Sequence, residues 1–256
     1  MSFTYVDRYL GIRLGLDLSE VIPGKLQVVE SHRRLTAEQS YGYIHGLWWM
    51  WLADDRRIVS VPPGTGETVM ATLQDLCCDQ SIFDNRFAEA LKGPVDMALV
   101  RAGLPATDRV IRDFVFACGG ELVRQHPLRS CRRLVDASVP AADGLCLPSH
   151  CFPDGVVYGV VCEGRVVSVA FAHRAGVLED VVADVGVETA PRYRRRGFAQ
   201  AAVSALAAHF TERGGESRYS CNPDNVASIA TARSVGFVRY GKSLILSSPR
   251  LVAAKQ

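Results

Sequence analysis

From residue 129 onwards, short apolar runs alternate with two segments of helical periodicity. The runs at 155–161 and 165–173 are joined by a Cys-Glu-Gly turn, which predicts a β-hairpin. Segment 198–213 has apolar residues at helical spacing and two following glycines, so we predict a helix that ends there. Segment 222–236 starts with capping residues and stops at a glycine, which predicts a second helix. Further strands are predicted at 130–136, 180–189, 217–221 and 237–246.

The first half mixes strand and helix patterns. Segment 25–31 predicts a short strand, and 42–63 predicts a hairpin whose first strand is apolar on both faces and therefore internal. Helical spacing follows at 69–76, at 83–91 with a stop at Lys-Gly-Pro, and at 110–118 with a stop at two glycines.

These patterns predict a mixed α+β protein of two domains, a smaller α/β domain at 1–128 and a second domain at 129–256. The three tryptophans, Trp48, Trp49 and Trp51, all lie in the predicted internal strand. We interpret them as core residues, and the wall of a substrate pocket is the alternative.

Composition is that of an ordinary globular protein, with 48% hydrophobic and 22% charged residues. No apolar run approaches the roughly 18 residues that would span a membrane, and the N-terminus lacks the layout of a signal peptide. We therefore expect a cytoplasmic protein whose eight cysteines are reduced. Only Cys146, His150 and Cys151 hint at a metal site, and because a second ligand pair is not apparent we expect no metal.

Charge is divided unevenly along the chain. Residues 1–128 carry a net charge of −3 and residues 129–256 a net charge of +5, with arginines concentrated at 192–196. This cluster indicates a local anion site, and the acidic first half argues against a nucleic-acid partner.

One segment, Pro62–Glu67, looks like the loop that binds nucleoside triphosphates. In the alignment with that motif, Val61 replaces the first glycine and Glu67 replaces the lysine. A carboxylate there would repel the phosphates, so we expect a simple turn between a strand and a helix and no ATP site.

Segment 185–203 is a better phosphate site. A strand ends, a turn follows, and a helix starts at Gly197 with Arg194, Arg195 and Arg196 just before it. Unpaired N–H groups at a helix N-terminus attract anions, and the glycine leaves the backbone open to a di- or polyphosphate. Ala199 keeps the next turn equally open.

The same residues resemble the GCN5-related N-acetyltransferase (GNAT) superfamily. Residues 194–199 fit its Gln/Arg-x-x-Gly-x-Gly/Ala motif, and 222–238 are similar to its second signature. Segment 130–141 is similar to the usual opening strand and helix, so the resemblance covers about 129–248. The alanine-containing second signature resembles the subgroup that includes zwittermicin-type resistance acetyltransferases.

The resemblance implies a twisted mixed sheet flanked by helices, in which a bulged strand splays from its parallel neighbour and acetyl-CoA, the co-substrate, enters the gap. It implies contacts to the coenzyme from the residues of the strand end, the arginine loop and the second signature: Val187, Glu188, Thr189, Arg194, Arg195, Arg196, Gly197, Phe198, Ala199, Asn225 and Ser228.

The reaction implied is attack of an amine on a thioester, for which a base must take the amine proton. The resemblance nominates Glu188 as this base, with Asp184 on the same strand face as the alternative. The backbone N–H of Val187 is a candidate oxyanion donor.

One position departs from the family pattern. Position 232 is alanine where many members have the tyrosine that protonates the leaving thiolate. Either the thiolate leaves unaided or another group serves, for which Tyr219, Cys221 and Ser234 are candidates.

The leading hypothesis is an N-acetyltransferase for a primary amine of a small molecule, such as an antibiotic or metabolite, or of a peptide. The alternative is a non-catalytic acyl-CoA-binding regulatory module. Only about twenty residues separate the first two strands of the second domain, so the first domain is expected to supply an acceptor wall that includes Tyr41, Tyr43 and His45. Alternatively, it is a degenerate second copy of the same fold. No feature of the sequence indicates an oligomeric state.

Overall fold

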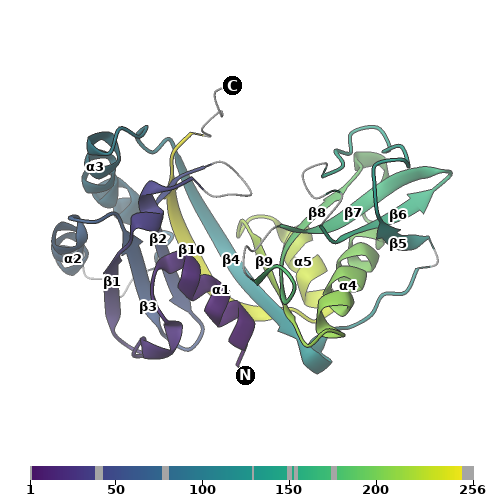
Figure 1. Cartoon of the computed structure of the whole chain (residues 1–256), viewed down its shortest axis with the longest axis horizontal. Helices are drawn as coiled ribbons and strands as arrows, with labels where there is room; N and C mark the ends of the chain where they lie inside the picture. Colours follow the sequence, from purple (N-terminus) through teal and green to yellow (C-terminus); the bar gives the residue numbers. More distant parts are fainter. Residues whose placement is uncertain are drawn as a thin grey trace. The chain divides into compact units, whose positions relative to one another are not determined.

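The computed structural model describes residues 2–37, 43–76, 81–128, 130–148, 152, 155–173 and 178–249 (Figure 1). The chain divides into two compact units, each discontinuous in sequence. Unit 1 consists of Met1–Tyr9 and Phe116–Arg239, and unit 2 of Leu10–Val115 and Tyr240–Gln256. This division differs from the contiguous domains expected from the sequence, because two strands and one helix have residues in both units.

Unit 1 contains the sheet and helices that the second half of the sequence predicted. Its strands are β5 (Cys131–Leu134), β6 (Val157–Cys162), β7 (Arg165–His173), β8 (Val182–Thr189) and β9 (Glu216–Cys221). Their order is β9-β8-β7-β6-β5, in which β8 and β9 are parallel and the other pairs antiparallel. Helix α4 (Phe198–Thr211) packs against this sheet and against α5 (Val226–Val235), so the hairpin and both helices are confirmed.

Both helices of unit 1 end where the sequence predicted. Asn225 caps α5, and Gly236 ends it with φ +103°. A Cβ at Gly236 would clash with the carbonyl group of Leu122. Both the positive φ and the lack of space for a side chain therefore require glycine at this position. After α4 the chain turns at Gly214, where φ is +74°.

Helix α1 (Thr4–Leu14), which the sequence analysis did not predict, begins in unit 1. The N–H groups of Tyr5 and Val6 donate to the carboxylate of Glu216 in β9, at 3.0 and 2.8 Å. The backbone N–H groups of the first turn are therefore hydrogen-bonded to a side chain that is distant in sequence. A local capping residue does not mark the start of this helix.

Unit 2 is built on its own set of strands and helices. They are β1 (Leu26–Glu30), β2 (His45–Leu52), β3 (Arg57–Val61), α2 (Gly66–Asp75), α3 (Asn85–Arg101) and residues of β4 (Arg109–Gly119) and β10 (Val238–Ser247). The strand order is β1-β3-β2-β10-β4, so β2 is internal, as predicted. Trp48 and Trp49 are buried in it, which confirms the core interpretation for these two, and Trp51 is half-buried beneath the cations of Arg57 and Lys242.

Two predicted elements of the first half were wrong. Segment 110–118 is the strand β4, because its β-branched and aromatic residues lie between neighbouring strands, and the apolar positions matched a helical spacing by coincidence. Helix α3 does not stop at 92–94 but continues through Pro94 to Arg101. The fully buried Val95 and Leu99 compensate for the backbone hydrogen bond that the proline lacks.

The loop that looks like a triphosphate-binding segment is occupied by the protein's own carboxylate. Glu30, at the end of β1, accepts a hydrogen bond of 2.7 Å from the N–H of Gly66. Hydrogen bonds from the backbone of Gly64, Gly66 and Thr65 lower the pKa of Glu30. An internal anion therefore fills the position where a phosphate would bind.

The strand connectivity of the two units differs. In unit 1 the parallel strands β8 and β9 are joined by α4, whereas in unit 2 the parallel strands β1 and β3 have the antiparallel strand β2 between them in the chain. This topology gives no support to the hypothesis that the first half is a degenerate copy of the second. Within the described ranges, no helix is long and apolar enough to cross a membrane.

Candidate active site

The site lies where two parallel strands of unit 1 separate. Strands β8 and β9 pair from Val182 opposite Glu216 to Val185 opposite Tyr219, and there the ladder stops although both strands continue. On its other edge β8 stays paired with β7 up to Thr189 without a register shift. The bulge that the resemblance implied is therefore absent from this ladder, and the opening comes from the divergence of β8 and β9.

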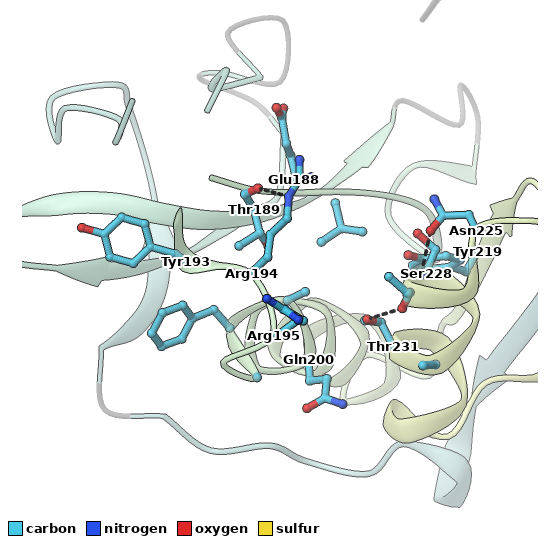
Figure 2. A pocket seen from close by; sticks show the side chains of 16 residues that line it. Glu188, Thr189, Tyr193, Arg194, Arg195, Gln200, Tyr219, Asn225, Ser228 and Thr231 are labelled. Atoms are coloured by element: carbon cyan, nitrogen blue, oxygen red, sulfur yellow. Dashed lines mark hydrogen bonds between the residues drawn. The ribbon is translucent and has the colours of Figure 1, made fainter. Parts of the chain in front are cut away.

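A cavity of about 730 Å³ opens at this divergence (Figure 2). It lies between the end of β8, the first turn of α4 and the first turns of α5. The residues that line it are Val187, Glu188, Thr189, Tyr193, Arg194, Arg195, Gly197, Phe198, Ala199, Gln200, Tyr219, Asn225, Ala227, Ser228, Ala230 and Thr231. The volume is in the range of sites for cofactors and small ligands.

The N-terminus of α4 presents free donors to this cavity. Its cap residue, Gly197, has φ +78° and offers no side-chain cap. The amides of the first turn, at residues 198–200, therefore point out of the helix without an intrahelical acceptor. Arg195 also has a positive φ, +62°, so the backbone turns sharply just before the helix. The result is a concave, electropositive loop suited to an anion.

The preceding arginines surround the same loop. Arg194, Arg195 and Arg196 are all exposed. The Nε of Arg194 donates to the carbonyl oxygen of Thr189 at 3.2 Å, which ties the loop to the end of β8. The guanidinium of Arg196 lies 5.5 Å from the ring centroid of Tyr193. Arg196 is the one predicted arginine that is not among the lining residues.

The opposite end of the cavity is formed by α5 and β9. The side chain of Asn225 accepts a hydrogen bond of 3.0 Å from the N–H of Ser228 and so caps α5. Tyr219 is only 2% exposed, and its ring packs against Phe237 at 5.7 Å. Burial raises the pKa of Tyr219 to about 12, and a side-chain hydrogen bond with Ser228 partly opposes this rise.

Glu188 lies on the wall of the cavity but its carboxylate faces the other side of the sheet. Figure 2 shows the carboxylate pointing away from α4, whereas Arg195 and Gln200 lie on the helix side. The residue is half-buried and pairs across the sheet with Val169. Its carbonyl oxygen accepts a hydrogen bond of 3.2 Å from the Ser168 hydroxyl, so the backbone around it is held.

Asp184, the alternative base, has a different environment. It is 5% exposed, and its carboxylate receives hydrogen bonds from Arg218 at 2.6 Å and from the Tyr9 hydroxyl at 3.0 Å. It is not among the residues that line the cavity. These contacts are those of a buried ion pair that joins β8, β9 and α1.

Replacing Asp184 with asparagine is expected to lower the free energy of unfolding by about 3–5 kcal/mol, because Arg218 would stay buried without its counter-charge. Urea denaturation would measure this, with the exposed Asp180→Asn as the control of equal chemistry. Unchanged stability combined with a large loss of turnover would instead assign Asp184 to the chemistry.

Other candidates from the sequence lie away from the cavity lining. Cys221 is buried, the Ser234 hydroxyl donates to the Thr231 carbonyl, and the side chain of Ala232 is fully buried. His45 is buried in unit 2 and hydrogen-bonded to Ser247, and Tyr41 lies outside the described residues.

The part of the chain that the structure describes holds no group of three or more His, Cys, Asp or Glu side chains placed to bind a metal. His150 and Cys151 of the metal hint fall outside that part.

Several residues that line the cavity were not predicted from the sequence. Tyr193, Gln200 and Thr231 all face the cavity. For Thr231 a signal existed, because it follows Ser228 by three positions and so shares its helix face. Tyr193 and Gln200 flank the arginine motif on either side, and only the loop geometry brings them to the cavity.

Comparison with known proteins supports this description. Residues 150–243 match the model of the family described as GNAT acetyltransferase. No curated protein matches the chain.

Similar solved structures include a GNAT-family acetyltransferase from Novosphingobium aromaticivorans, with 25% identity, 56% of this chain and 66% of that chain covered, and a TM-score of 0.46. A GCN5-related N-acetyltransferase from Kribbella flavida has 18% identity, coverages of 60% and 63% and a TM-score of 0.40. A Drosophila protein has 17% identity, coverages of 96% and 90% and a TM-score of 0.46.

The chain spans at most about two thirds of the length of the Novosphingobium and Kribbella proteins, at 66% and 63%. All three TM-scores are below 0.5, so the identification of the domain does not depend on these structures. It depends on the family match. Residues 150–243 are therefore identified as a GNAT acetyltransferase domain by the family match.

Proposed function

We propose that the protein is an acetyl-CoA-dependent N-acetyltransferase that transfers an acetyl group to a primary amine of a small molecule or peptide, by direct attack within a ternary complex. The observation that carries this proposal is the divergence of β8 and β9 into a cavity that ends at the uncapped N-terminus of α4. The small-molecule acceptors proposed include the amines of antibiotics and metabolites, as expected from the sequence.

The residues present fit the coenzyme. The amides after Gly197, with Arg194 and Arg195, would hold the pyrophosphate, because they are donors and cations around a loop with no side chain in the way. The edge of β8 at Val187–Thr189 faces the opening, so its backbone groups would pair with the amides of the pantetheine arm like an added strand. The coenzyme supplies an acyl group activated as a thioester.

Glu188 is the better placed of the two candidate bases. An ammonium cannot attack an acyl carbon, so the acceptor must lose a proton as it reacts. Glu188 is on the cavity wall with its carboxylate toward the face opposite α4, and Asp184 is held by Arg218 and Tyr9. We assign proton acceptance to Glu188, directly or through a water.

The acceptor then approaches from the face of β7 and β8 that does not carry α4. Phe171 and His173 of β7 lie on this face, since they pair with Gly186 and Asp184 on the same side as Glu188. Their rings are 4.8 Å apart, and a Cβ at Gly186 would clash with the ring of Phe171. The surface beside the base is thus partly aromatic.

A non-catalytic acyl-CoA-binding module is the second candidate. The observation that favours it is Ala232, which provides no acid for the leaving thiolate and is fully buried. Both candidates require the coenzyme cavity, and only the enzyme turns acetyl-CoA over.

Titration calorimetry with acetyl-CoA and, in parallel, with ATP tests the common part of the proposal. We expect binding of acetyl-CoA and none of ATP, because Glu30 already occupies the amides of the other glycine loop. Release of free thiol in the presence of a panel of primary amines then separates enzyme from sensor. Absence of acetyl-CoA binding would overturn both candidates.

A further inference from the structure

Tyr219 occupies the point at which β8 and β9 separate. It is the last residue of β9 that pairs with β8, opposite Val185, and it lines the cavity. A pantetheine arm that starts at the arginine loop and follows the free edge of β8 would run from Thr189 towards this point, where pairing with β9 begins. Tyr219 is therefore the residue of β9 that lines the cavity, at the position where the ladder ends.

Its neighbours hold the phenol in one orientation. The ring packs edge-on against Phe237 at 5.7 Å, and the residue is 2% exposed. Ser228 hydrogen-bonds to the hydroxyl, and the backbone N–H of Ser228 is itself held by the cap Asn225. Figure 2 shows Tyr219 beside Asn225 and Ser228 at this end of the cavity.

The ionisation of Tyr219 limits what it can do. Burial raises its pKa to about 12, so the phenol stays neutral throughout the physiological range. An ordinary alkyl thiol has a pKa of about 8.5, so full proton transfer from this phenol to a thiolate is unfavourable by roughly three orders of magnitude. A neutral phenol nevertheless donates a strong hydrogen bond to an anionic acceptor.

We infer that Tyr219, positioned by Ser228, donates a hydrogen bond to the coenzyme sulfur and stabilises it as the departing thiolate. This inference rests on the proposed function. Tyr219 would contact the reacting atoms and is a catalytic residue, whereas Ser228 is a positioning residue. The arrangement takes over, as a hydrogen bond, the role that an acid at position 232 would have, and Ala232 is buried away from the cavity lining.

The step balances without an acid. A bond forms between the acceptor nitrogen and the acyl carbon, and the proton lost from nitrogen goes to Glu188 or to a water bound to it. The bond between carbon and sulfur breaks with its electron pair on sulfur. Tyr219 keeps its proton, and the thiolate takes a proton from solvent after it leaves the site.

The test measures the affinity of two probes, coenzyme A and desulfo-coenzyme A, from about pH 7 to about pH 10. If Tyr219 stabilises the thiolate, coenzyme A should bind about tenfold more tightly at the alkaline end, which corresponds to a lowering of its thiol pKa by about one. Desulfo-coenzyme A, which lacks the sulfur, should show no such gain and corrects for every other group that titrates.

Tyr219→Phe should abolish the alkaline gain for coenzyme A while leaving desulfo-coenzyme A affinity within about twofold, which also shows that the variant is folded. Ser228→Ala, on a helix surface, should reduce the gain and serves if the core variant does not fold. Equal pH profiles for the two probes in the unmodified protein, or a full gain in Tyr219→Phe, would overturn the inference. If neither probe binds the unmodified protein at any pH, the proposed function fails instead.

Discussion

Replacing Gly197 with glutamate is expected to weaken acetyl-CoA binding by at least a hundredfold. The residue caps α4 with φ +78° and has no side chain, and the amides behind it are free to bind an anion. A glutamate there would place a negative charge where the pyrophosphate binds. Loss of two charge-assisted hydrogen bonds, at about 1.5–3 kcal/mol each, accounts for at least this factor. Titration calorimetry measures it.

Gly214→Glu provides the matched control. Gly214 follows the other end of α4 and also has a positive φ, +74°. A Cβ at Gly214 would meet no other atom within 4 Å, so the substitution causes comparable backbone strain away from the cavity. Both variants should lose similar thermal stability, and only the Gly197 variant should lose binding. Normal acetyl-CoA affinity in Gly197→Glu would mean that the coenzyme does not use this loop.

Glu188→Gln is expected to lower kcat by about two to four orders of magnitude, the usual contribution of a general base. Glutamine has the same shape but cannot accept the amine proton, and the backbone of β8 at this position stays paired with β7. The affinity for acetyl-CoA should therefore change by less than about twofold. Steady-state kinetics with any amine that supports turnover, together with calorimetry, separates the two effects.

Glu212→Gln is the control, because Glu212 is exposed at the far end of α4 and makes the same change in charge. A fully active Glu188→Gln would show that the base lies elsewhere. In that case Asp184, which is paired with Arg218, becomes the next candidate for the base. The turnover rate of Asp184→Asn should then be measured together with its stability.

The coenzyme site was the most predictable part of the molecule, because its signals are local. The strand, the arginine turn, Gly197 and the two glycine-terminated helices follow one another within about fifty residues of sequence, and the structure has each of these elements where the pattern indicated. Capping residues and glycines with positive φ act over a few positions, so they can be recognised without knowledge of the fold.

What could not be predicted depends on contacts between distant segments. The apolar spacing of segment 110–118 fits a helix, and only the pairing of neighbouring strands with both of its edges makes it a strand. Helix α3 continues through Pro94 because Val95 and Leu99 are fully buried. The placement of Tyr219 at the strand divergence follows from the register between β8 and β9. Occupation of a glycine loop by Glu30 likewise depends on a residue more than thirty positions away.

The position of β10 has a consequence for how the chain acquires its structure. In unit 2, β10 lies between β2 and β4, yet the part of β10 that belongs to this unit, from Tyr240 on, is synthesised after residues 116–239. Domains usually fold in the order in which they leave the ribosome. Here unit 2, most of whose residues precede residue 116, would wait with the edges of β2 and β4 that pair with β10 unpaired until more than one hundred further residues have emerged. Unit 1 can therefore reach its folded state earlier, and nascent unit 2 is the stage at which we expect dependence on chaperones.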